Sequence, residues 1–280
     1  MNPLQFLTNA HVAIVAGKGG VGKTTVTAVL ARAAADRGLR VLVVELDGKP
    51  TLASLVGDDI ACLALTPTAA LAEYLDTHGL GRVAKRLART GVIEVVATAA
   101  PGIDDIVVLG KIKQLEQTGA YDLIVVDGPA AGHAITFLMA PTNLLKLVRG
   151  GPIRSQAADV AELLTDPARS QVILVTLPET TPVNEVIETA ESLKSDGGVR
   201  LGPVVVNAYD EGDDLPADQA PADSPLRAAA DFRNARRGLH RREARRLADA
   251  LDLEQVRLPL VAAPALDSDS IADLAAAATA

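Results

Sequence analysis

Short runs of Val, Ile, Leu and Ala recur along the chain, and stretches with helical periodicity separate most of them. The runs lie at 12–16, 40–45, 92–97, 122–127, 171–176, 203–207 and 256–260. Near-continuous apolar runs are typical of strands buried on both faces, and their alternation with helices indicates βαβ units. The sequence therefore predicts an α/β fold, with a mostly parallel central sheet of about seven strands and helices on both faces.

The stretches between these runs predict the helices and the domain organisation. Helices are expected at 24–37, 67–90, 103–118, 181–194 and 226–251. Thr181-Pro182 is typical of a helix start, because a capping hydroxyl precedes a proline. We expect one domain over 1–280, with helical insertions near 52–90 and 140–168. Residues 209–225 contain six acids, three prolines and no base, which predicts a mobile acidic loop.

Composition narrows the classes of function. The 280 residues are 49% hydrophobic and 22% charged, enough for one large core. A net charge of −8 and only 2% aromatic residues disfavour nucleic acid as a partner. No window approaches the roughly 18 apolar residues of a spanning helix, so we expect no membrane span and a cytoplasmic protein. Cys62 is the single cysteine, and a small buried thiol is its expected state.

A glycine-rich loop follows the first apolar run and precedes the first helix. Its pattern is G-x-x-x-x-G-K-[ST], the phosphate-binding loop (P-loop) of P-loop NTPases. Backbone N–H groups would surround the phosphates, Lys23 would reach the β- and γ-phosphates, and Thr24 would bind Mg²⁺. The alternative is a glycine-rich turn without a ligand. The predicted binding residues for ATP are Gly17, Gly19, Gly20, Val21, Gly22, Lys23, Thr24 and Thr25.

Lys18 adds a second lysine directly after the first glycine of the loop. This loop resembles the deviant Walker A motif of the MinD/ParA/ArsA ATPases. The resemblance implies that Lys18 contacts phosphate, typically across a face-to-face dimer, as an arginine finger does. The alternative is an ordinary solvated lysine.

Three polar residues follow the ends of other apolar runs. Asp47 is the candidate that orients the attacking water, although it could be a turn aspartate before glycine. Asp127 ends a run of Walker B type and is a candidate Mg²⁺ ligand, directly or through water. Asn207 either reads the adenine base or caps the next turn. Ligand chemistry belongs at the carboxyl ends of parallel strands, which is where all three fall.

The segment from Asp127 to His133 resembles switch II of the arsenite-pump (ArsA) and tail-anchored-protein-targeting ATPases, D-x-x-P-x-G-H-T. Pro129 stands one position early, and Ala134 replaces the threonine. His133 is therefore a switch candidate, with a structural hydrogen-bonded histidine as the alternative. The runs Val175–Glu179, Val204–Asn207 and Val256–Pro264 resemble further parts of the same family, so the likeness covers most of 10–265.

Some features of that family are missing from the sequence. One cysteine cannot supply the thiolate cluster for arsenite, and no C-x-x-C motif exists for a dimer-joining zinc. The switch I pattern D-P-A-H becomes Asp47-Gly48-Lys49-Pro50, so its histidine is absent.

The resemblance implies an ATPase in which Lys18, Lys23 and Asp47 act on Mg·ATP. Hydrolysis would reset switches at 47–50 and 127–133, and so open or close a homodimer or a heterodimer with a paralogue. The output would be transport, targeting or chaperone work on a membrane-protein client or pump. A MinD/ParA-type positioning or partition ATPase is one alternative, and a weakly active subunit of a heteromeric complex is another. The arginine-rich helix at 226–251 is expected to be solvated or salt-bridged, with an anionic partner surface as the alternative.

Overall fold

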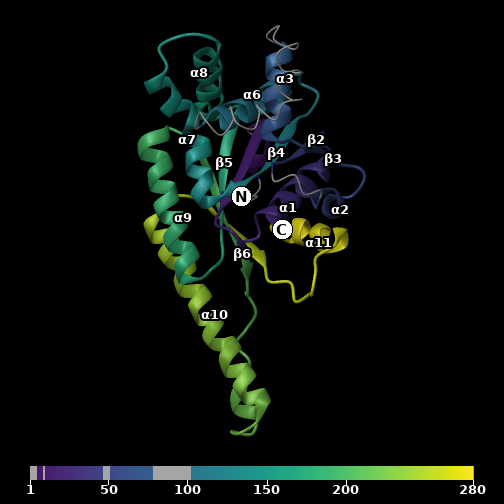
Figure 1. Ribbon diagram of the computed structural model, residues 1–280. Helices are drawn as coiled ribbons and strands as arrows, with labels where there is room; N and C mark the ends of the chain where they lie inside the picture. Colours follow the sequence, from purple (N-terminus) through teal and green to yellow (C-terminus); the bar gives the residue numbers. More distant parts are fainter. Residues whose placement is uncertain (1–4, 9, 47–50, 78–101, 280) are drawn as a thin grey trace.

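The computed structural model describes residues 5–8, 10–46, 51–77 and 102–279 (Figure 1). Seven strands form one sheet in the order β3-β2-β4-β1-β5-β6-β7, and every neighbouring pair is parallel. The strands are β1 (Val12–Gly17), β2 (Val41–Glu45), β3 (Ala61–Ala64), β4 (Leu123–Ala130), β5 (Ser170–Thr176), β6 (Leu201–Tyr209) and β7 (Gln255–Pro259). The predicted parallel α/β sheet is confirmed.

Helices cover both faces of this sheet (Figure 1). Their bounds are α1 (Lys23–Ala35), α2 (Leu52–Val56), α3 (Pro67–Thr77), α6 (Ile103–Gln117), α7 (Ala131–Leu147), α8 (Pro152–Thr165), α9 (Thr180–Ser192), α10 (Pro225–Ala250) and α11 (Ser268–Thr279). Single turns of tighter or wider helix are η1 (Gln5–Thr8), η2 (Leu193–Gly197) and η3 (Ala217–Gln219). Among the described helices, none is long and apolar enough to cross a membrane.

Alternate side chains of the buried strands enter two separate cores. In β1, Val12 and Ile14 pack toward α6, α7, α8 and α9, whereas Ala13 and Val15 pack toward α1 and α11. This period of two is why near-continuous apolar runs were needed in the sequence. Both cores end where the strands end, which leaves the carboxyl edge of the sheet open to polar residues.

The structure changes some expectations from the sequence. The seventh described strand is β3, a short edge strand inside a segment that was expected to be helical, while the run at 92–97 lies outside the described residues. Cys62 lies on β3 and is exposed, so the expectation of a buried thiol is wrong. Helix α9 begins at Thr180 with Glu179 as its N-cap, one turn position before the cap predicted at Thr181.

The basic helix and the acidic segment before it lie against each other. Asp210 pairs with Arg233 at 3.0 Å, and Asp214 pairs with Arg241 at 3.3 Å. The side chain of Asn234 also bonds the backbone N–H and C=O of Leu215, at 2.8 and 2.9 Å. The expectation of a salt-bridged arginine helix is therefore confirmed.

Candidate nucleotide site

The phosphate loop joins the carboxyl end of β1 to the start of α1. Gly17 ends the strand, and a Cβ there would lie 2.5 Å from the carbonyl oxygen of Val175 on β5. Gly22 is the N-cap of α1 with a left-handed φ of 88°. A Cβ at Gly22 would lie 2.1 Å from Nδ2 of Asn207. These two glycines are required by close approach and by a positive φ, which places the loop at a helix N-terminus where anions are favoured.

Asn207 reaches this loop from the end of β6. Its amide Nδ2 donates a hydrogen bond to the carbonyl oxygen of Val21 at 2.9 Å, and the residue is 9% exposed. The next residue, Ala208, is the one non-glycine residue with a positive φ (54°) among those described. The structure thus gives Asn207 a clamping contact with the loop, while its reading of adenine stays a prediction.

The two lysines of the loop make different contacts. The Lys23 ammonium donates to the backbone carbonyl of Lys18 at 3.2 Å, so it lies folded over the loop. The Lys18 ammonium pairs with Oε1 of Glu185 on α9 at 2.5 Å. Both side chains of that pair are partly exposed, 42% for Lys18 and 34% for Glu185. Sequence reasoning missed this partner, because Glu185 stands 167 residues away along the chain.

Asp127 lies beside the start of α1. Its Oδ2 accepts a hydrogen bond from the Thr24 hydroxyl at 2.8 Å, and its Oδ1 accepts one from the Thr27 hydroxyl at 3.3 Å. The register of the parallel strands pairs Val15 of β1 with Asp127 of β4. The structure therefore brings together the two predicted magnesium ligands, Thr24 and Asp127.

The remaining predicted residues have different outcomes. Asp47 and the rest of 47–50 lie outside the described residues. Glu45, the last residue of β2, is buried and accepts hydrogen bonds from the backbone N–H and hydroxyl of Thr51, at 3.2 and 2.9 Å. His133 is exposed near the start of α7. Its position leaves both the switch role and the structural role open.

Two carboxyl groups near His133 were not singled out from the sequence. Asp104 and Asp105 lie in the first turn of α6, after the left-handed Gly102. Burial raises the pKa of Asp104 above its usual value. Burial also raises the pKa of Asp105, with a further rise from Asp104 and an opposing effect from His133. The signal was the Gly-Ile-Asp-Asp sequence itself, since paired acids after a glycine start a helix.

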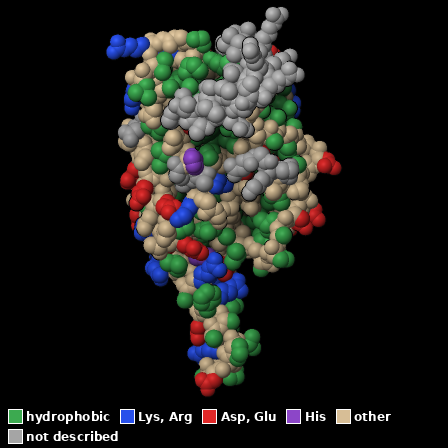
Figure 2. Space-filling model, viewed as in Figure 1, with side chains coloured by type: hydrophobic (Ala, Val, Ile, Leu, Met, Phe, Trp, Pro, Cys, Tyr) green, Lys and Arg blue, Asp and Glu red, His purple; other side chains and the backbone are tan. Residues whose placement is uncertain are grey.

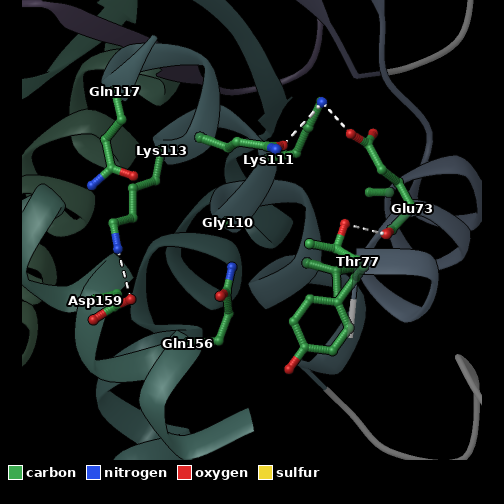
Figure 3. Close-up of a pocket in the computed structure, with 12 residues that line it drawn as sticks. Glu73, Thr77, Gly110, Lys111, Lys113, Gln117, Gln156 and Asp159 are labelled. Atoms are coloured by element: carbon green, nitrogen blue, oxygen red, sulfur yellow. Dashed lines mark hydrogen bonds and ion pairs between the residues drawn. The ribbon is translucent and has the colours of Figure 1, made fainter. Parts of the chain in front are cut away.

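A separate pocket lies between α3, α6 and α8, away from the phosphate loop (Figure 3). Its volume is about 250 Å³, and two lysines on its walls are held by carboxylates. Lys111 pairs with Glu73 at 2.5 Å and Lys113 with Asp159 at 2.6 Å. No predicted nucleotide-site residue lines this pocket.

Comparison with known proteins settles which family this site belongs to. The sequence profile of the anion-transporting ATPase family matches residues 10–150, which contain the phosphate loop, Asp127 and His133. The chain belongs to the anion-transporting (ArsA) ATPase family. It is accordingly a P-loop ATP hydrolase, and the family implies that it binds ATP.

Relatives of this ATPase come from several kinds of organism. "ATPase BagA" of Mycobacterium tuberculosis is 34% identical over 241 residues, which cover 78% of this chain and 69% of the relative. A "Putative arsenical pump-driving ATPase" of Halobacterium salinarum is 27% identical, covering 68% of this chain and 34% of the relative. "ATPase GET3B" of Arabidopsis thaliana is 25% identical, covering 69% and 63%.

Proposed function

We propose that this ATPase hydrolyses Mg·ATP at the loop between β1 and α1, and that the hydrolysis drives switching of a dimer. In this proposal Lys23 binds the β- and γ-phosphates, Lys18 stabilises the transferring phosphoryl group, and Asp47 orients the attacking water. The observation that carries the proposal is the contact between Thr24 and Asp127, 2.8 Å long, beside the N-terminus of α1. It joins the end of the phosphate loop to the end of the strand two places from β5 in the sheet.

The donor set at this point fits magnesium. A hydroxyl and a carboxylate are the hard oxygen ligands that Mg²⁺ prefers, and Mg²⁺ commonly takes its other ligands from water and phosphates. When bound, the ion would neutralise charge on the phosphates. Among the described residues no group of three or more His, Cys, Asp or Glu is placed to hold a metal. Thr24 and Asp127 are therefore the residues we assign to the ion.

We further propose a transport, targeting or chaperone role, with a membrane-protein client or pump as partner. The printed names of two relatives, an arsenical pump-driving ATPase and GET3B, support this kind of output. An arsenite substrate is not part of the proposal, because Cys62 is the single cysteine of the chain. The partly exposed Lys18 supports a dimer, since its ammonium can turn from Glu185 toward a second subunit.

The test is magnesium-dependent ATP turnover of the wild type, Lys23→Ala and Asp47→Asn. We expect each substitution to lower kcat by at least about 100-fold, as the loss of a group that stabilises the transition state does. Asp47→Asn should keep ATP affinity, whereas Lys23→Ala should weaken it. Lys146→Ala is the matched control, because this lysine is exposed on α7 and should be silent. Normal turnover in Lys23→Ala would refute the assignment.

A further inference from the structure

Helix α10 extends as an arm beyond the rest of the molecule (Figure 1). Near its C-terminal end, Ala244 and Leu247 are buried in the main core. Toward its N-terminal end, one side lies on the acidic segment, where Arg237 is 1% exposed and faces Asp210 and Asp214 at 3.4 and 3.7 Å. An isolated helix of this kind is marginal in water, so the state of its other side matters.

The other side of the arm carries apolar residues at alternating spacings of three and four. We call this set the α10 stripe, and it consists of Pro225, Ala228, Phe232, Ala235 and Leu239. The first four are exposed, with Phe232 at 70%, and Leu239 is half-buried. Spacings of three and four are those of the a and d positions along the seam of a two-stranded coiled coil. The arm shows both apolar and charged side chains at its surface (Figure 2).

Two opposite charges flank the stripe. Asp231 lies on one side of it and Arg236 on the other, five residues later. In heptad terms they are g and e positions, which face each other between chains when two helices run parallel and in register. In an antiparallel pair, g would face g and e would face e, so like charges would meet. The charges of the stripe therefore complement a parallel copy of themselves.

The contacts that these two side chains make within the chain are long. Asp231 lies 3.5 Å from Arg227, and Arg236 lies 3.5 Å from Glu179. The side chains of Asp231 and Arg236 are 60% and 44% exposed. Exposed pairs of this kind contribute little, so both groups can exchange these partners for a second helix.

We propose that the α10 stripe is a self-association surface, on which α10 of a second copy of this chain packs parallel and in register. Phe232 then packs on its counterpart, Ala228 and Ala235 let the helices approach closely, and Asp231 pairs with Arg236 in both directions. A membrane surface is the other candidate for an apolar stripe beside arginines. It is disfavoured because the acidic segment 210–223 runs along the same arm and would repel anionic lipid.

This pairing does not require nucleotide and does not rest on the proposed dimer switching. The experiment is sedimentation velocity of the full chain without nucleotide, over a range of concentrations. The wild type is expected to dimerise. Phe232→Asp should raise the dimer dissociation constant at least about 100-fold, because two phenylalanines leave each interface. Leu226→Asp is the matched control, since Leu226 is 74% exposed on the same arm but lies off the stripe.

Register and direction are tested separately. Asp231→Arg should weaken the dimer, and Asp231→Arg combined with Arg236→Asp should restore it. In a Cys62→Ser background, Ala235→Cys should give a disulfide-linked dimer on mild oxidation, whereas Leu226→Cys should not. The ATP affinity of each variant, measured in parallel, should match that of the wild type and shows that the nucleotide site is intact.

Several results would overturn the proposal. These are a wild type that is monomeric at every concentration, equal effects of Phe232→Asp and Leu226→Asp, or no rescue by the charge exchange. Binding of the monomer to phosphatidylserine vesicles that depends on Phe232 would assign the stripe to a membrane instead.

Discussion

Removal of the Glu185 carboxylate tests the action of Lys18 most directly. In the structure the Lys18 ammonium is held 2.5 Å from Glu185 within its own chain. A lysine that stabilises a transferring phosphoryl group must leave this partner first. The substitution Glu185→Gln keeps the shape of the side chain and removes its charge, so Lys18 should become available more readily.

The size of the effect follows from the exposure of the pair. With side chains 42% and 34% exposed, water and salt screen the attraction between the two charges. Exposed ion pairs contribute about 0.2–1 kcal/mol, which corresponds to a factor of about 1.4–5 in an equilibrium or a rate. Glu185→Gln should therefore raise kcat/KM for ATP by no more than about fivefold, and added salt should shrink the gain.

The assay compares ATP turnover of the wild type, Glu185→Gln, Lys18→Ala and the double variant. Lys18→Ala should lower turnover by at least about tenfold, and adding Glu185→Gln to it should change nothing further. Glu188→Gln, an exposed carboxylate one turn along α9, is the control and should be silent. If Glu185→Gln slows turnover, or speeds it equally without Lys18, the competition between phosphate and Glu185 is refuted.

Three other outcomes follow from single contacts. Asn207→Ala leaves the Val21 carbonyl without its partner, so urea denaturation should show a loss of about 1–3 kcal/mol in unfolding free energy, together with weaker ATP affinity. Burial, with a smaller effect of Arg236, holds the pKa of His240 below its ordinary 6.5. Unfolding free energy should therefore fall as pH drops from 6.5 toward that lower value, because only the unfolded chain binds the proton there, and His240→Gln should flatten this slope. Burial and then Glu45 raise the pKa of the Cys62 thiol, so a disulfide reagent should modify it more slowly at neutral pH than a free cysteine.

The phosphate loop could be predicted because its chemistry is local in sequence. The glycines, Lys23 and Thr24 form one short stretch between an apolar run and a helix, and the structure places them at that junction. Asp127 and Asn207 could be predicted because parallel strands end at one edge, so a polar residue after an apolar run lies at the ligand side.

Other features could not be predicted, because they depend on packing between distant segments. The contact of Lys18 with Glu185 requires α9 to lie beside the loop, and no periodicity along the chain specifies that. Strand β3 was missed because Ala61–Ala64 is short, largely exposed and lies at the sheet edge, so it lacks the apolar run of a central strand. The exposure of Cys62 follows from the same edge position.

The loop has one part fixed by packing and another held by contacts that a nucleotide would have to exchange. Gly17 and Gly22 lie so close to Val175 and Asn207 that the backbone of the cradle has little room to move. The polar side chains are different, because each already has a partner within the protein. Lys23 donates to a backbone carbonyl, Thr24 to Asp127, and Lys18 to Glu185. If all three turn to phosphate or metal, the affinity for ATP measures the difference between the new contacts and these old ones. Of the three, the Lys18 contact joins the loop to α9, so its exchange is the step that can connect nucleotide binding to movement of another element.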